Sequence, residues 1–272
     1  MNSPAEMQQL LTQVTEIARE ACAAILEIYD SNNFVISTKA DQSPITDADR
    51  LAHEIIEHRL STLTPHIPMI SEEAYIPEFD IRTQWPLYWL VDPIDGTREF
   101  IEGTGEFTIN IALISKHQPI LGVVCVPVEE TYYCAAVGVG AYKEDYEKVR
   151  LPLQVRKRPP HEMLVLTSRR YHAPEIEAFL ERLGTIYRAR VGSSLKLCLI
   201  AEGEVDVYPR FGDTFEWDIA AGQCIIEQAG GAIFDNKMQP IRYNMHHTMI
   251  NPPFVAVGDV NQDWAHFFEG DF

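Results

Sequence analysis

The segment DPIDGT at positions 92–97 places two aspartates, Asp92 and Asp95, on a tight turn directly after an apolar run. Open α/β sheets bind ligands at the carboxyl ends of their strands, so we expect both carboxylates at a binding site. Two carboxylates three positions apart can share one hard cation or bridge two. A helix that begins at Thr97 would add N–H groups that favour an anion beside the cation. The alternative is an Asp-rich turn that only caps a helix.

Two further acidic positions strengthen the metal interpretation. Glu72 and Glu73 follow a predicted strand, and Asp218 stands at the start of a predicted helix whose next residues are small. Each has an ordinary alternative, because the two glutamates could be solvated loop charges and Asp218 could be a helix N-cap. Several carboxylates in one partly dry pocket would repel each other and any phosphate, and divalent cations remove that repulsion. Mg²⁺ prefers carboxylate, carbonyl and water oxygens.

The first half of the chain must supply helices and strands that position these acids. Apolar residues recur at helical spacing over residues 4–29 and 47–63. Thr46, with Asp49 three positions on, predicts an N-terminal cap for the second helix. Runs rich in β-branched and aromatic residues predict strands over 66–71, 87–91, 107–114, 120–128 and 131–137, with a turn at 116–119.

The second half alternates between strand and helix, which is the pattern of an α/β sheet. Strands are predicted over 163–167, 185–190, 205–208 and 231–234, and helices over 174–183, 194–201 and 218–228. The basic, proline-containing stretch 148–160 is interpreted as either a domain connector or a solvated edge strand. As a connector it would separate an N-terminal α+β subdomain, residues 1–158, from a C-terminal α/β subdomain, residues 159–272.

Charge and cysteine content exclude several classes of function. The chain has 22 Lys and Arg against 40 Asp and Glu, a net charge of −18, which repels nucleic-acid polymers and anionic membranes at long range. Its five cysteines form no C-x-x-C pair, which indicates reduced, buried thiols in a cytoplasmic protein. No apolar run approaches the ~18 residues that span a bilayer, so we expect no integral membrane contact. Peripheral association with the inner face of the membrane, and the oligomeric state, stay open.

Together these residues resemble the signature of the magnesium-dependent, lithium-sensitive phosphomonoesterases of the inositol monophosphatase superfamily. The matching pieces are Glu72 and Glu73, the DPIDGT segment at 92–97, and the WDIAAG segment at 217–222 followed by two glycines at 230–231. Within the superfamily, the segments 95–100, 105–113, 192–196 and 208–212 are most similar to the bacterial 3′(2′),5′-bisphosphate nucleotidases. The resemblance implies an α/β fold, a layered α/β/α/β sandwich with two subdomains.

The resemblance also implies a set of metal ligands. Glu72, Asp92 and the carbonyl of Ile94 would hold one Mg²⁺ ion. Asp92, Asp95 and Asp218 would hold a second, with Asp92 bridging the two. A weaker third ion would lie near Glu72. Two ions a few ångströms apart suit in-line phosphoryl transfer, because one activates a water and the other stabilises the leaving oxygen.

Roles in catalysis and substrate binding follow from the same resemblance. Asp49 and Thr97 match the pair that orients and deprotonates the attacking water, so no covalent phosphoenzyme is needed. The N–H groups of Gly96 and Thr97 would hold the scissile phosphate. A second phosphate needs a local cationic patch in so acidic a chain, for which the candidates are Ser193, Lys196 and Arg210. The expected substrate-binding residues are therefore Glu72, Asp95, Gly96, Thr97, Ser193, Lys196, Arg210 and Asp218.

The implied reaction is hydrolysis of the 3′-phosphate of adenosine 3′,5′-bisphosphate, a product of sulfate assimilation, with activity on 3′-phosphoadenylylsulfate as well. Two alternatives stay open: an inositol-1-phosphate phosphatase, and a non-catalytic metal- or nucleotide-binding regulator on the same fold. The intact Asp49 and Thr97 argue against the regulator. One residue departs from the family pattern, since Glu216 adds an acid close to Asp218 and could alter the pocket near the substrate's ring or base.

Overall fold

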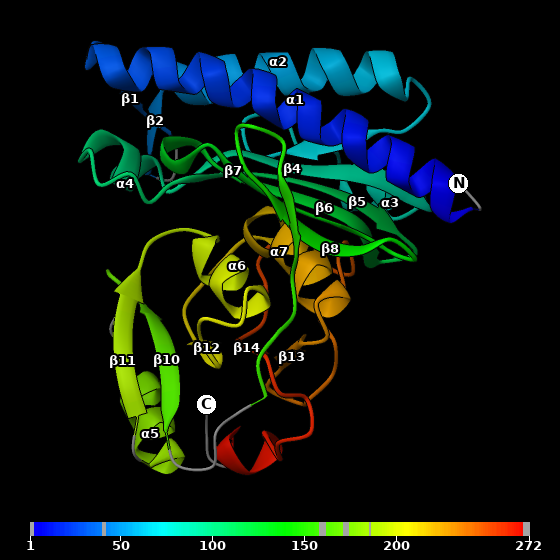
Figure 1. Ribbon diagram of the computed structural model, residues 1–272. Coiled ribbons are helices and arrows are strands. Elements are labelled where there is room, and N and C mark those ends of the chain that lie inside the picture. The colour runs from blue at the N-terminus through cyan, green and yellow to red at the C-terminus, as the bar shows by residue number, and fades with distance from the viewer. Residues whose placement is uncertain (1–2, 40–41, 158–161, 171–173, 185, 269–272) are drawn as a thin grey trace.

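A computed structural model describes residues 3–39, 42–157, 162–170, 174–184 and 186–268 of the chain. The described elements form layers (Figure 1). Helices α1 (Pro4–Ser31) and α2 (Asp47–Leu63) cover one face of a seven-stranded sheet, and helices α6 (Leu195–Ala201) and α7 (Glu216–Gln228) lie between that sheet and a five-stranded one. The predicted α/β/α/β sandwich is confirmed. Helix α5 (Pro174–Leu183) adds a cover on the outer face of the second sheet.

The seven-stranded sheet carries two of the acidic positions. Its order is β3-β4-β5-β6-β7-β8-β9, with β3 parallel to β4 and the other neighbouring pairs antiparallel. The strands are β3 (Met69–Ser71), β4 (Leu87–Asp95), β5 (Thr108–Ser115), β6 (Gln118–Val126), β7 (Thr131–Ala136), β8 (Gly140–Glu144) and β9 (Arg150–Pro152). Within β4, Trp89–Val91 pair with strands on both sides, whereas Asp92 and Asp95 pair only with β5.

The five-stranded sheet has the order β11-β10-β12-β14-β13, with β11, β10 and β12 parallel and β14 antiparallel to both of its neighbours. Its strands are β10 (Met163–Ser168), β11 (Ile186–Val191), β12 (Val207–Arg210), β13 (Ala232–Asp235) and β14 (Phe254–Val257). The remaining short elements are β1 (Ile36–Thr38), β2 (Pro44–Thr46), α3 (Phe79–Arg82), α4 (Thr97–Ile101), η1 (Pro127–Glu129) and η2 (Ala265–Phe268).

The two long helices start as local sequence chemistry dictates. The Thr46 side chain accepts a hydrogen bond from the backbone N–H of Asp49, and the Asp49 carboxylate accepts one from the N–H of Thr46. This capping box confirms the predicted start of α2. An equivalent box, formed by Ser3 and Glu6, begins α1. The predicted helices over 4–29 and 47–63 are both confirmed.

Helix α7 packs against the seven-stranded sheet at a glycine. A Cβ atom placed on Gly122 of β6 would lie 2.4 Å from the carbonyl oxygen of Ala221, so only glycine allows the helix to approach this closely. The apolar residues between α6, α7 and the two sheets form one buried cluster that includes Trp217 and Ala220. This packing sets where the first turn of α7 lies relative to the end of β4.

Some predicted boundaries are wrong. The strand predicted over 66–71 begins only at Met69, because Pro65 and Pro68 cannot donate hydrogen bonds to a sheet. Helix α7 begins at Glu216, two residues earlier than predicted. In the stretch 148–160, Arg150–Pro152 form the edge strand β9, so the edge-strand alternative is confirmed there. The subdomain boundary at 158 lies outside the described residues and stays a prediction.

The structure can also be compared with two expectations about the cysteines and about membrane-spanning helices. All five cysteines are buried and free, as expected for reduced thiols. Among the described helices, none has both the length and the apolar character needed to cross a membrane.

Candidate active site

The end of β4 departs from regular strand geometry at the two aspartates. Asp92 pairs with Asn110 of β5 and Asp95 with Thr108, and the register shifts between them. The N–H of Ile94 donates a hydrogen bond to Oδ1 of Asp92 at 3.0 Å, which fixes that carboxylate. The chain then turns through Gly96 at φ 97°, a left-handed conformation that glycine adopts without strain, and α4 begins at Thr97. The predicted helix start at Thr97 is therefore confirmed.

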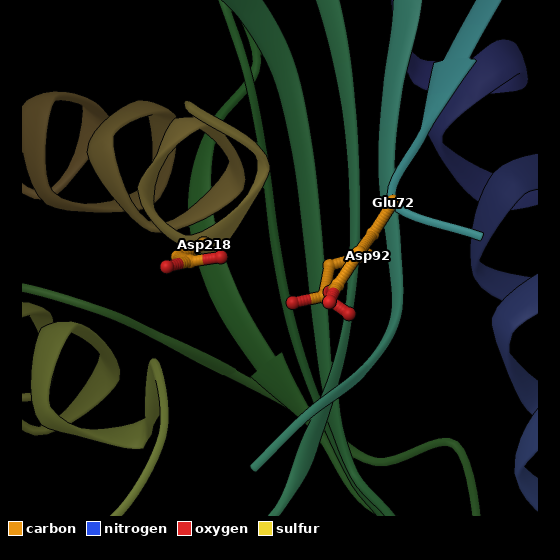
Figure 2. A group of neighbouring side chains, drawn as sticks. All are labelled: Glu72, Asp92 and Asp218. Atoms are coloured by element: carbon orange, nitrogen blue, oxygen red, sulfur yellow. The ribbon is translucent and has the colours of Figure 1, made fainter. Parts of the chain in front are cut away.

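Three carboxylates from distant parts of the chain meet beside this turn. Glu72 follows β3, Asp92 belongs to β4, and Asp218 lies in the first turn of α7. Each offers an oxygen atom, and these atoms all lie within 4.8 Å of one another. Figure 2 shows Glu72 and Asp92 side by side, with Asp218 facing them from the helix. A cluster of this kind could hold a metal ion, as the sequence predicted for these residues.

Electrostatics support a cation at this cluster. Burial raises the pKa of Asp92 well above its ordinary range, and the charges of Glu72, Asp95 and Asp218 raise it further. Burial and the neighbouring acids likewise raise the pKa of Asp218, while the pKa of Asp95 rises to about 6, chiefly through burial. Grouped acids that repel each other in a dry site favour a bound divalent cation, because it neutralises them. The residues present therefore fit a hard metal ion.

Lys39 approaches the same cluster, which the sequence analysis did not anticipate. Its Nζ donates to Oε1 of Glu72 at 2.6 Å and to Oε1 of Glu73 at 2.5 Å. Burial raises the pKa of Glu73 to about 7, although the bond from Lys39 acts in the opposite direction. Lys39 lies far from Glu72 in the sequence, so no local pattern indicated this pairing.

Asp49 and Thr97 meet, although they come from different elements. The Thr97 hydroxyl donates to Oδ1 of Asp49 at 3.1 Å, while Oδ2 of Asp49 accepts from the N–H and the hydroxyl of Thr46. Asp49 is 1% exposed, and this burial raises its pKa. One carboxylate thus serves both as the helix cap and as the partner of Thr97. The role of the pair in activating a water stays a prediction.

A cavity of about 330 Å³ opens beside the acids, within the size range of small-ligand sites. Of the predicted substrate-binding residues, its lining includes Asp95, Gly96, Ser193, Lys196, Arg210 and Asp218. Residues that the sequence analysis did not assign to the site also line it, namely Glu99, Ser168, Arg170, Gly192, Ser194, Leu197, Tyr208, Thr214 and Ile219. Acidic and basic side chains therefore line the same cavity.

Two of the cations that line the cavity, Lys196 and Arg210, donate hydrogen bonds to neighbouring backbone carbonyls. Nζ of Lys196 donates to the carbonyls of Val191, at 3.2 Å, and Ser193, at 2.5 Å, and lies over the ring of Tyr208. Burial lowers its pKa to about 8. The Arg210 guanidinium donates to two carbonyls of the loop after β12. These contacts position both side chains at the cavity, and their contact with a substrate stays a prediction.

Ser194, in the loop before α6, donates hydrogen bonds to residues of β4 and β5. Its N–H donates to Oδ2 of Asp95 at 2.5 Å, and its hydroxyl donates to Oδ1 of Asn110 at 2.7 Å. The same hydroxyl lies 2.7 Å from that of Thr108. The sequence singled out the segment 192–196 as a motif but assigned no role to Ser194. Its bonds show that the loop before α6 fixes the orientation of Asp95.

Glu216, whose effect on the substrate pocket the sequence left open, does not line the cavity beside the acids. Its carboxylate is 4% exposed and accepts two hydrogen bonds from the N–H of Asn244, at 2.9 and 2.8 Å. It lines a different cavity, formed with residues of the 239–252 segment. Two positions along a helix correspond to about 200° of rotation, so Glu216 and Asp218 point to nearly opposite sides.

Comparisons with known proteins agree with this geometry. A sequence model described as the inositol monophosphatase family matches residues 6–264. The chain is 46% identical over 247 residues to the 3′(2′),5′-bisphosphate nucleotidase CysQ of Escherichia coli, covering 90% of this chain and 98% of that protein. It is 34% identical to the CysQ of Haemophilus influenzae, covering 96% of this chain and 97% of that one.

Solved structures show the same fold. CysQ from Bacteroides thetaiotaomicron, described as a bacterial member of the inositol monophosphatase family, superposes with a TM-score of 0.80 at 36% identity, covering 92% of this chain and 97% of that chain. An inositol monophosphatase from Zymomonas mobilis superposes with a TM-score of 0.75 at 23% identity, over 96% of both chains.

Proposed function

Because the chain belongs to the inositol monophosphatase family, we propose that it is a Mg²⁺-dependent phosphomonoesterase that removes the 3′-phosphate from adenosine 3′,5′-bisphosphate. The observation that carries the proposal is the convergence of Glu72, Asp92 and Asp218 beside a cavity that also presents cationic side chains. Relatives named 3′(2′),5′-bisphosphate nucleotidase, at 34% and 46% identity, support the choice of substrate. We propose 3′-phosphoadenylylsulfate as a second substrate, because it carries the same 3′-phosphate.

The proposed metal ligands are those of the sequence analysis. Glu72, Asp92 and the carbonyl of Ile94 would hold one Mg²⁺, and Asp92, Asp95 and Asp218 would hold another; the approach of Glu72, Asp92 and Asp218 to one another supports this set. When bound, Mg²⁺ supplies Lewis-acid activation of a water and stabilises charge on the leaving oxygen. A third, weaker ion near Glu72 would compete with the Lys39 ammonium, which contacts Glu72 at 2.6 Å.

The chain's own side chains then complete the reaction. Asp49, which accepts the Thr97 hydroxyl at 3.1 Å, orients the attacking water through Thr97 and accepts its proton. The raised pKa of Asp49 suits a general base better than an ordinary aspartate would. The N–H groups of Gly96 and Thr97 bind the scissile phosphate at the turn after β4.

Specificity for a bisphosphate is proposed to come from the cavity cations. Lys196 and Arg210, with the Ser193 hydroxyl, bind the 5′-phosphate that is not hydrolysed. An inositol-1-phosphate phosphatase is the competing proposal, because the fold is shared with an inositol monophosphatase. Inositol 1-phosphate has one phosphate, so it leaves that cationic wall unused.

A phosphate-release panel tests the proposal. The purified chain is assayed with adenosine 3′,5′-bisphosphate, 3′-phosphoadenylylsulfate and inositol 1-phosphate, with and without Mg²⁺. We expect Mg²⁺-dependent release with the highest kcat/KM on adenosine 3′,5′-bisphosphate. A preference for inositol 1-phosphate would contradict the nucleotidase assignment. No release from any substrate would favour the non-catalytic regulator instead.

Two further points stay predictions. The five free, buried cysteines are consistent with the proposed cytoplasmic location, because thiols stay reduced there. The division into subdomains 1–158 and 159–272 is proposed because each of the two sheets lies within one of these ranges.

A further inference from the structure

Arg170 follows β10 and lines the same cavity as Asp95 and Lys196. Its Nε donates to Oε1 of Glu99 at 2.9 Å, and its Nη2 donates to Glu102. The two glutamates belong to the α4 segment after the first sheet's β4, whereas Arg170 follows a strand of the second sheet. The ion pairs therefore hold the guanidinium between the two sides of the cavity.

The Arg170 guanidinium retains donors for a ligand. A guanidinium has five N–H donors, and those toward Glu99 and Glu102 account for two of them among the described residues. The Arg170 side chain is 39% exposed. Lys196 is instead buried, and its Nζ already donates to two backbone carbonyls. Arg170 is thus the more accessible of these two cations.

The charges that line the cavity also favour a contact between Arg170 and an anionic ligand. Glu99 lines the cavity and is only 7% exposed, so its carboxylate would repel an anionic substrate. In the proposed function Mg²⁺ neutralises Asp95 and Asp218, but Glu99 is not among the metal ligands. Its ion-pair partner Arg170 neutralises Glu99, while the second partner of Arg170, Glu102, has a 53% exposed side chain whose charge water screens.

We propose that Arg170 is a specificity-determining residue that binds the phosphate of the substrate that is not hydrolysed, while Glu99 and Glu102 hold its side chain in place. The inference rests on the proposed function and names one more contact at the same site. A planar guanidinium presents two parallel donors that match two phosphate oxygens, which a lysine ammonium cannot do. A nucleotide without that phosphate gains nothing from Arg170.

Kinetics of an Arg170→Ala variant test this contact. We compare adenosine 3′,5′-bisphosphate with adenosine 3′-monophosphate, which lacks the second phosphate. Loss of charged hydrogen bonds should lower kcat/KM for the bisphosphate about 10- to 100-fold, mainly through KM. For the monophosphate we expect a change below about 3-fold. Arg170→Lys should fall between the wild type and Arg170→Ala on the bisphosphate.

The neighbouring Arg169 offers a matched control. It stands in the same segment and forms the same kind of ion pair, with Glu106 at 2.5 Å, but it is not among the described residues that line the cavity. Arg169→Ala should leave the ratio of the two kcat/KM values unchanged. If Arg169→Ala and Arg170→Ala change that ratio equally, Arg170 only supports the loop and the inference is overturned.

The double variant Arg170→Ala/Glu99→Gln separates contact from simple charge neutralisation. If Arg170 touches the phosphate, the loss persists when Glu99 is made neutral. Recovery of wild-type discrimination would show that Arg170 only masks Glu99 and would overturn the inference.

A binding measurement keeps this result separate from the proposed function. Titration calorimetry with adenosine 5′-monophosphate should show roughly 10-fold weaker binding to Arg170→Ala than to the wild type. If the wild type hydrolyses nothing, the proposed function fails, and this titration still decides for or against the Arg170 contact.

Discussion

Replacing Asp95 with asparagine should have opposite effects on activity and on stability. Asp95 lines the cavity, and its Oδ2 accepts the N–H of Ser194 at 2.5 Å. Asparagine keeps a similar shape and an oxygen that accepts this bond, but it carries no charge. We expect Asp95→Asn to lower kcat by orders of magnitude, because a metal-ligand charge is lost at the transition state. We expect the metal-free variant to be more stable than the wild type.

The size of the stability effect follows from the pKa. Burial raises the pKa of Asp95 from 3.8 to about 6, so its folded state binds a proton about 160-fold more tightly. That ratio corresponds to about 3 kcal/mol. The free energy of unfolding therefore falls as the pH rises from 3.8 to about 6. At pH 7 the full decrease is present. The figure is an upper value, because water in the cavity screens the charge.

Urea unfolding in the presence of a chelator measures this effect. At pH 7, Asp95→Asn should be more stable than the wild type by up to about 3 kcal/mol, and at pH 4 by less than about 1 kcal/mol. Asp263→Asn is the control, because Asp263 is exposed and its change should stay within about 0.5 kcal/mol. A variant no more stable than the wild type at pH 7, or a difference independent of pH, would refute the reasoning.

Three other substitutions probe separate parts of the structure. Lys196→Ala should raise KM for adenosine 3′,5′-bisphosphate much more than for a monophosphate; equal effects in steady-state assays would contradict its role. Gly122→Ala places a Cβ 2.4 Å from the Ala221 carbonyl and should lower stability by about 1–3 kcal/mol in urea unfolding; an unchanged midpoint would contradict the close packing. Glu216→Ala leaves the buried Asn244 N–H without its acceptor and should lower stability by about 1–3 kcal/mol with unchanged substrate preference; altered preference would return Glu216 to the substrate site.

Local features of this site were predictable from the sequence because neighbouring residues encode them. The capping pair Thr46 and Asp49 marked the first turn of α2, and the structure places the helix start there. The DPIDGT segment similarly predicted the helix that begins at Thr97, although the strand before it runs on through Asp95 and does not end at Val91 as predicted. Resemblance to a family then supplied the grouping of acids that no single segment could indicate.

Boundaries were less predictable where backbone hydrogen bonding depended on neighbours. The strand predicted over 66–71 begins only at Met69, because the prolines before it have no backbone N–H to donate to a sheet. A pattern of apolar residues does not show which residues lack this donor. The role of Glu216 stayed open because its proximity to Asp218 in the sequence does not show which way its side chain points. On a helix, residues two apart face nearly opposite ways, so Glu216 contacts Asn244 while Asp218 faces the acids.

By itself, then, the amino-acid sequence determined the helices, most strands and the identity of the acids, because period, caps and turns act over a few residues. Tertiary structure alone decided which side chains meet. Helix α7 lies against Gly122 and so brings Asp218 to within 4.8 Å of the acids from two neighbouring strands. The contacts of Lys39 with Glu72 and of Arg170 with Glu99 likewise join residues that are far apart in the sequence. Such contacts depend on how whole layers pack, and no short stretch of sequence records that packing.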